Sequence, residues 1–467
     1  MLSIEDLIMK QSSHSGASLP ENDHAGIVAD DARPSLWKTT DYGPWLVADT
    51  SGTLGASMAG FAIPLIVLAV TGSAAQASLV SAVQSCVSAA TNIPGGLLQD
   101  RCDRRMLLLI WSATGVLLFG GAGLLGRMGW LGVAGLMVLA ILLGLRSGLL
   151  GNTSNAMLRG VVPDRELARA MSLNSARDAV INLASDPISG MLMHMGNTVP
   201  LLSGAVMNVI SMIGAWRIRR YWKVGDDDGN GDGGDGGRHG GPSGSTVRKE
   251  MEIGWRVAFS GMEWLFRWPF QRCVIIASMA FNGSINALLL ITQMQVTRQT
   301  GSTFVAAMVG TIGSVGMLIG AAAAAGIIDR LRGGIIICLS FWLMAVGSFG
   351  VALMPNVWGK GLLLFVGLLM LPAGNAVAGG YLSILVSKGN QGRLGAAQTL
   401  CGMGAYALLT AAGGVMMDRF GYTTAALALA GIMGIAALIA SSNGVLRSIP
   451  KPDAWQGHIE RCGLQRF

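Results

Sequence analysis

Long apolar segments dominate this chain, and short polar or charged turns separate them. A helix that crosses the hydrocarbon core of a bilayer needs ~20 mostly apolar residues. Segments of that length predict an all-α membrane protein with twelve transmembrane helices in two pseudo-symmetric six-helix bundles. Their expected ranges are 44–70, 74–98, 106–126, 130–152, 170–193, 198–217, 272–294, 303–326, 334–354, 360–385, 394–416 and 422–441.

Polar stretches divide the chain into parts. We expect a disordered cytoplasmic tail over 1–40, an N-terminal bundle over 41–220, a cytoplasmic linker over 221–271, a C-terminal bundle over 272–441 and a cytoplasmic tail over 442–467. The linker combines a Gly/Asp-rich disordered stretch with an amphipathic helix, Ile253–Arg267, which is expected to lie along the membrane interface. The first residues lack the charged and apolar regions of a cleavable signal.

Composition agrees with a membrane protein. The chain is 51% hydrophobic and 13% charged, whereas soluble proteins carry roughly 25% charged residues. We attribute the net charge of +7 to basic cytoplasmic loops and not to nucleic-acid binding, because no basic helix or aromatic-basic array is present. The cysteines and histidines are scattered, so neither a metal site nor a cofactor is expected.

Lys and Arg are distributed unevenly between alternate loops. The side with most of them contains Arg101, Arg104, Arg105, Arg159, Arg165, Arg169, Arg217, Arg219, Arg220, Lys223, Arg330, Arg332, Lys388 and Arg393, and the other side contains Arg127, Arg298, Lys360 and Arg419. Since basic loops stay in the cytoplasm, this asymmetry predicts a multi-pass protein of the cell membrane with both termini in the cytoplasm.

A charged turn between the second and third predicted helices is the main motif. It places Asp100, Arg101, Arg104 and Arg105 shortly after Gly96. Such a turn must lie at a membrane face. Taken alone, this turn could also be a charged loop that only ends a helix and has no further function.

A weaker copy in the second half places Asp329 and Arg330 after Ala325. Together with the similar spacing of Arg169 and Asn174 to Arg393 and Gln398, it indicates a duplication. Two equivalent bundles around a central site are the architecture of a rocking transporter.

We interpret the charged turn as a cytoplasmic gate. Asp100 would favour the outward-open state by lying at the positive N-terminus of a helix from the other half, an interaction worth ~0.3–1 kcal/mol. Arg101, Arg104 and Arg105 would reach neighbouring acids. Asp329 and Arg330 would form the weaker mirror copy.

The fifth predicted helix carries a polar stripe. Asn174, Asp178, Asn182 and Asp186 recur every four residues, with Arg177 beside them, so they share one helical face that should meet the central cavity or a partner helix. An intramembrane charge costs ~2.5–3.5 kcal/mol on the insertion scale and marks a candidate functional site. We hypothesise that Asp178, Asp186 or both exchange protons; the alternative is helix packing through polar contacts, or an Asp178–Arg177 pair at the surface.

Two further charges lie inside predicted helices. Arg146 in the fourth could pair with an acid of the first or fifth helix, or bind an anionic group of a substrate. Asp49 lies near the cytoplasmic end of the first helix, where it is either part of the coupling site or an interfacial residue.

Several of these stretches resemble the major facilitator superfamily over about residues 40–445. The turn from Gly96 to Arg105 is similar to the superfamily's loop 2–3 signature, and Arg146 resembles the arginine of its helix 4 motif. Within the family, the Asp-Arg-x-Asp-Arg-Arg form of the turn and the stretches 62–73, 162–174 and Gly392–Gly395 resemble a drug-efflux branch that includes macrolide exporters and the enterobactin exporter.

Three positions depart from the family pattern. Asp103 replaces the usual Gly of the loop signature, Ala56 follows Gly55 where the family often has Asp, and Asp186-Pro187 replaces the usual Gly-Pro of the helix 5 antiporter motif. The last two put ion coupling by the family's usual groups in doubt.

The resemblance implies a monomeric secondary transporter without enzymatic activity. Its expected function is proton-coupled efflux of small amphipathic or drug-like compounds by alternating access, with a small-molecule substrate, the lipid bilayer and protons as partners. Alternatives are a siderophore or lipid exporter, a solute importer of the same fold, or a non-transporting membrane receptor or scaffold. Amides expected in the cavity are Gln84, Asn92, Asn152, Asn155, Asn282, Asn286, Gln293, Asn375 and Gln398.

Overall fold

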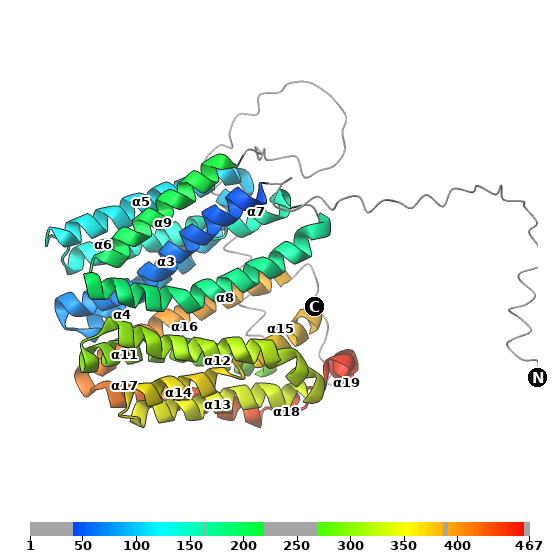
Figure 1. Ribbon diagram of the computed structural model, residues 1–467. Coiled ribbons are helices and arrows are strands. Elements are labelled where there is room, and N and C mark those ends of the chain that lie inside the picture. The colour runs from blue at the N-terminus through cyan, green and yellow to red at the C-terminus, as the bar shows by residue number, and fades with distance from the viewer. Residues whose placement is uncertain (1–40, 163, 219–268, 386–390, 462–467) are drawn as a thin grey trace, which may run out of the picture. The chain divides into compact units, whose positions relative to one another are not determined.

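The computed structural model describes residues 41–162, 164–218, 269–385 and 391–461, and long helices form nearly all of this part (Figure 1). The predictions for residues 1–40 and for the helix at 253–267 lie outside the described residues. In the first half the helices are α3 (Tyr42–Thr71), α4 (Ala74–Arg101), α5 (Arg104–Arg127), α6 (Val133–Leu150), α7 (Thr153–Val161), α8 (Asp164–Met195) and α9 (Val199–Arg217).

The second half repeats this arrangement. It consists of α11 (Pro269–Thr300), α12 (Thr303–Arg330), α13 (Gly333–Leu353), α14 (Val357–Leu368), α15 (Leu371–Leu385), α16 (Gln391–Phe420) and α17 (Tyr422–Ser442). The short helices α18 (Gly444–Arg447), η1 (Pro452–Ala454) and α19 (Trp455–Arg461) follow.

The predicted all-α membrane fold is confirmed. Within the described residues, 10 helices are long and apolar enough to cross a membrane, counting α6 with most of α7, and α14 with α15, as single spans. The remaining two spans, α4 and α8, are 28 and 32 residues long but more polar. The structure also begins the fifth span earlier than hydropathy predicts, at Asp164 instead of residue 170.

The two polar helices lie where protein covers them. α4 packs between α6 of its own half and α16 of the other, and α8 packs between α3 and α12. Polar side chains on α4 and α8 therefore meet other helices more than lipid, which lowers the cost of placing them in a bilayer. These two helices also make the main contacts between the halves.

The turns define two ends of the bundle. We call the end with the Arg101–Arg104 and Arg330–Gly333 turns the basic end, and the end with the Thr71–Ala74 and Thr300–Thr303 turns the distal end. Each long helix runs from one end to the other.

The segment after α17 folds back onto the basic end. The carbonyl oxygens of Pro450 and Ile449 accept hydrogen bonds from the first N–H groups of α13, and Lys451 donates to the Asp329 carbonyl at 2.7 Å. His458 is buried and hydrogen-bonded to Tyr381 and Ser448, each at 2.9 Å. Burial, together with nearby Arg461, lowers the pKa of His458, so its imidazole is neutral at pH 7.

Candidate functional site

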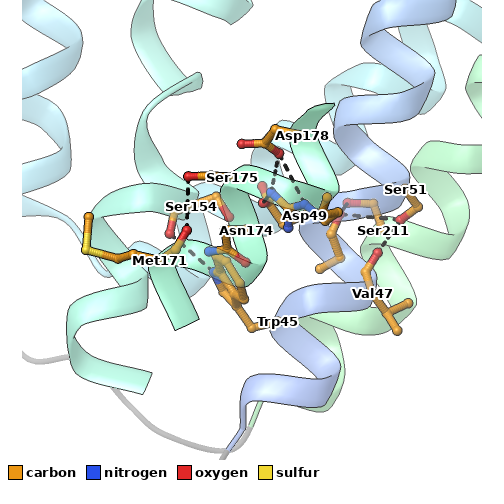
Figure 2. Close-up of polar contacts among 12 residues, drawn as sticks. Trp45, Val47, Asp49, Ser51, Ser154, Met171, Asn174, Ser175, Asp178 and Ser211 are labelled. Carbon is orange, nitrogen blue, oxygen red and sulfur yellow. Dashed lines mark hydrogen bonds and ion pairs between the residues drawn. The ribbon is translucent and has the colours of Figure 1, made fainter. Parts of the chain in front are cut away.

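Near the basic end, one guanidinium joins two helices of the N-terminal half. Arg177 on α8 contacts the carboxylate of Asp49 on α3 at 2.5 Å and that of Asp178 at 2.7 Å. Figure 2 labels Asp49 and Asp178, the two acids that Arg177 contacts. The side chains of Arg177 and Asp49 are 13% and 12% exposed, whereas that of Asp178 is 49% exposed.

Aromatic residues of α3 surround this charge cluster. The ring of Trp45, one turn before Asp49, lies 5.7 Å from the guanidinium carbon, and its indole N–H donates to the Ser154 carbonyl at 3.2 Å. The Tyr42 hydroxyl donates to the Asn174 side-chain oxygen at 3.4 Å, and Asn174 is buried. The Tyr42 ring stacks on the Trp45 ring, with centroids 5.6 Å apart, and Figure 2 labels Trp45, Ser154 and Asn174. Asp49 and Asn174 therefore belong to the packing between α3 and α8.

Asp49→Asn is expected to lower the thermal stability of the purified protein, because Arg177 would lose its buried anionic partner. A hydrogen bond to a charged group contributes ~1.5–3 kcal/mol. The matched control is Asp178→Asn, whose half-exposed carboxylate should contribute ~1 kcal/mol or less. Unfolding midpoints in detergent provide the measurement, and equal losses in the two variants would contradict this assignment.

Asp186 lies further along α8, at the contact between the halves. Its carboxylate lies near the side chains of Gln293 on α11 and Ser185, and a Cβ added to Gly310 of α12 would lie 3.6 Å from it. Gln293 is itself buried. A titratable group of the first half thus contacts two helices of the second.

The four residues of the predicted stripe have different surroundings. Asn174 packs against α3, Asp178 is half-exposed beside Arg177, Asn182 is exposed, and Asp186 contacts α11. α8 packs against α3 of its own half and α12 of the other half, so residues spaced four apart meet different neighbours.

Arg146 is buried inside the N-terminal half. Its guanidinium donates to the Asn208 side-chain oxygen at 2.7 Å and to the Trp111 carbonyl at 3.0 Å, and it lies 3.5 Å from the centre of the Trp111 ring. Its hydrogen-bond acceptors are thus neutral groups of α5 and α9. Pairing with Asp49, one of the partners expected for it, is not present, because Asp49 is bound to Arg177.

The arginines of the charged turn contact their own half. Arg104 donates to the Ala156 carbonyl at 2.9 Å, and Arg105 donates to the Trp216 carbonyl at 2.8 Å. Asp103 caps α5 by accepting the backbone N–H of Arg105 at 2.8 Å, which explains an acid where the family signature usually has Gly. Arg101 is half-buried, and the side chain of Asp100 lies outside what the structure describes.

The mirror copy of the turn is exposed. The side chains of Asp329 and Arg330 both face outward at the end of α12. The backbone carbonyl of Asp329 is bound by Lys451 of the C-terminal segment. This copy is therefore held by the chain's own last residues rather than by the first half.

The halves meet closely at the distal end. A Cβ on Gly190 of α8 would lie 2.9 Å from the Cβ of Ala307 on α12, and the Thr303 hydroxyl donates to the Gly190 carbonyl at 3.1 Å. A second contact joins Asp418 of α16 to the start of α4, with Arg298 beside it. In the sequence, Arg298 contributes only to the difference in Lys and Arg content between the two sides, and no motif marks Asp418 as a functional residue.

Two cavities are lined by uncharged residues. One of about 290 Å³ lies at the contact between the halves and is lined by Gln84, Ser85, Ser88, Ser147, Met403 and Tyr406. The other, of about 100 Å³, lies among helices of the C-terminal half, and its polar lining residues are Ser278, Asn282, Ser340, Asn375 and Asn443. Among the described residues, no group of His, Cys, Asp and Glu could hold a metal ion.

Two similar helical halves, close contact at one end and an uncharged cavity between them define a multi-pass membrane protein of the transporter type. A family model described as Major Facilitator Superfamily matches residues 50–404, and the chain belongs to this family. No curated protein matches the chain.

Solved structures of transporters have the same fold. The nucleoside transporter NupG is 14% identical with a TM-score of 0.64, covering 85% of this chain and 98% of that one. A D-xylose-proton symporter is 14% identical with a TM-score of 0.61, covering 85% and 97%. An inward-open conformation of the xylose transporter XylE from E. coli is 13% identical with a TM-score of 0.61, covering 86% and 96%.

Proposed function

We propose that this protein is a proton-coupled secondary transporter that exports small amphipathic or drug-like compounds across the cell membrane by alternating access. The observation that carries proton coupling is the placement of Asp186, which bridges the two halves through Gln293. When the halves tilt, this carboxylate must change its surroundings. A carboxylic acid that alternates between burial and solvent can load and release a proton.

The cavity between the halves supports the substrate class. The lining residues that the structure describes offer one amide, four hydroxyl groups and a methionine, and all of them are uncharged. Such a surface offers no charge to bind an ionic group, and it offers hydrogen bonds to the polar groups of an amphipathic molecule. The drug-efflux resemblance of the charged turn supports export over import.

We place the basic end in the cytoplasm, with both termini on that side, because Lys and Arg gather there. The distal end would then face outward. Because the halves are in contact there, the conformation corresponds to one that is closed to the outside. The inward-open structure of the xylose transporter XylE has a similar fold.

Dye retention in cells tests this proposal. Cells that overproduce the protein are expected to retain less ethidium or Nile red than cells with an empty vector, and an uncoupler should remove the difference. Ethidium is a cation and Nile red is neutral, so the pair also reports on substrate charge. Equal retention of both dyes with and without the protein would count against drug export.

Import of a neutral polar solute is the second candidate. The amides Asn282 and Asn375 and the hydroxyl groups beside them favour it, as do the nucleoside and xylose transporters of similar fold. Uptake of labelled uridine and D-xylose by the same cells distinguishes the two. Uptake of either solute above the vector control, without an effect on the dyes, would favour import.

A further inference from the structure

The end of α16 caps the start of α4 at the distal end. The Asp418 carboxylate accepts hydrogen bonds from the Ala74 and Ala75 backbone N–H groups at 3.0 and 2.8 Å and from the Ser73 hydroxyl at 2.7 Å. Arg298 contacts the same carboxylate at 3.2 Å and donates to the Gly72 carbonyl at 2.6 Å. The first N–H groups of a helix lack partners within it and favour a negative charge. A carboxylate of one half thus satisfies a helix of the other.

A glycine one turn earlier lets the two helices approach. A Cβ on Gly414 would overlap the Ser78 side chain and lie 2.6 Å from the Ala74 carbonyl oxygen. Because the carbonyl oxygen belongs to the backbone, it cannot rotate away. The contact between α4 and α16 at this point therefore requires glycine at position 414.

The same sequence pattern ends both helices. α4 ends with Gly95-Gly96-Leu-Leu-Gln-Asp100-Arg101, and α16 carries Gly413-Gly414-Val-Met-Met-Asp418-Arg419 just before its last residue, Phe420. Each pattern has two glycines, two apolar residues, one further residue and Asp-Arg. The copy on α4 lies at the basic end, and the copy on α16 lies at the distal end.

The two helices are antiparallel with a regular register. Ala74 lies beside Asp418, Ser78 beside Gly414, and Ser85 is hydrogen-bonded to Tyr406. Each step forward along α4 is thus matched by an equal step back along α16. If the same register continued to the basic end when that end is closed, Asp100 would lie opposite Gly392 in the first turn of α16, as Asp418 lies opposite the first residue of α4.

The two copies differ in their present contacts. A Cβ on Gly414 would meet α4, whereas a Cβ on Gly96 would meet nothing within 4 Å. The copy at the distal end is engaged, and Gly96 at the basic end faces open space. This difference is what a latch with one closed and one open end requires.

We propose that Asp418, Gly414 and Arg298 form a distal latch that holds the outer end closed and alternates with the Asp100–Gly96 copy at the basic end. The inference rests on the alternating access proposed above. Rocking would break the hydrogen bonds of Asp418 to α4 and bring Gly96 against the first turn of α16. Only one copy would be engaged at a time.

Distances between spin labels test the latch in the full-length protein, with its native cysteines replaced, in nanodiscs. One label pair, Met128→Cys with Trp358→Cys, joins the two halves at the distal end, and another, Trp216→Cys with Arg330→Cys, joins them at the basic end; all four side chains are exposed. No substrate or gradient is added, so failure of the proposed export would leave these distances unaffected.

Gly414→Val is expected to lengthen the distal distance and shorten the basic one, because the larger side chain prevents distal closure. Gly96→Val should keep both distances of the parent. Asp418→Ala should shift the distances in the same direction as Gly414→Val. If Gly414→Val fails to fold, the distances in Asp418→Ala test the latch on their own. Arg419→Ala, an exposed neighbour, is the control and should change nothing.

A folded Gly414→Val or Asp418→Ala protein with the parent's distal distance would overturn the latch. A shift of Gly96→Val toward a closed basic end would also overturn it, as would an Arg419→Ala shift equal to that of Asp418→Ala.

Discussion

Asp186→Asn is expected to abolish transport driven by a pH gradient while leaving substrate exchange intact. The amide has nearly the same shape and can still hydrogen-bond to Gln293, so the contact between the halves should persist. An amide does not take up or release a proton near neutral pH. Proton movement down the gradient would therefore no longer be coupled to transport. Ethidium accumulation in inverted membrane vesicles with an acidic interior measures gradient-driven transport. Exchange of labelled for unlabelled ethidium without a gradient measures substrate exchange.

Asp178→Asn is the matched control for this result. Asp178 lies on the same helix, but its half-exposed carboxylate is paired with Arg177 within its own half. We expect it to retain gradient-driven accumulation. Full accumulation in the Asp186→Asn variant would refute coupling through Asp186, and equal loss in both variants would show that the effect is not specific to the contact with Gln293.

Hydropathy predicts most of the helices because a bilayer imposes a minimum apolar length on each span. The predicted segment 303–326 and the helix Thr303–Arg330 begin at the same residue. Hydropathy is a weaker guide for α4 and α8, whose polar side chains are accommodated by contacts with both halves. In α8 the charged residues after Asp164 also conceal the true start of the helix.

Side-chain pairing is harder to derive from the sequence than helix position. Asp49 and Arg177 lie on helices far apart in the chain, and no local pattern links them. The spacing of Asn174 to Asp186 indicates a polar helix, but it does not tell which neighbour each residue meets. That depends on how α8 packs between α3 and α12, a property of the assembled bundle.

The two ends of the structure illustrate the same limit. The charged turn at Arg104 and Arg105 is conspicuous in the sequence, yet its described contacts are to backbone carbonyls of its own half. The distal contact depends on one acid, Asp418, in the short turn between the predicted segments 394–416 and 422–441. A comparison of helix ends would have found it, because the Gly-Gly and Asp-Arg pairs recur on α4 and α16.

Gly320→Val is expected to lower thermal stability more than Asp49→Asn. Gly316 and Gly320 lie one turn apart on the face of α12 that packs against α14 and the break before α15. A Cβ on Gly320 would overlap the Leu369 carbonyl oxygen, and one on Gly316 would lie 2.9 Å from the Phe365 Cα. Small residues at this spacing let membrane helices approach closely. Since the obstructing atoms are backbone, the helices must separate, and overpacking of this kind costs about 3 kcal/mol.

Gly326→Val provides the matched control on the same helix. A Cβ at Gly326 would meet nothing within 4 Å, and valine has a higher helix propensity than glycine. The unfolding midpoint of the purified protein, followed by tryptophan fluorescence on heating in detergent, should therefore fall for Gly320→Val and stay near the parent value for Gly326→Val. A parent-like midpoint for Gly320→Val would mean that α12 and α14 can separate at little cost, and the close packing of these two helices would then contribute little to the stability of the C-terminal half.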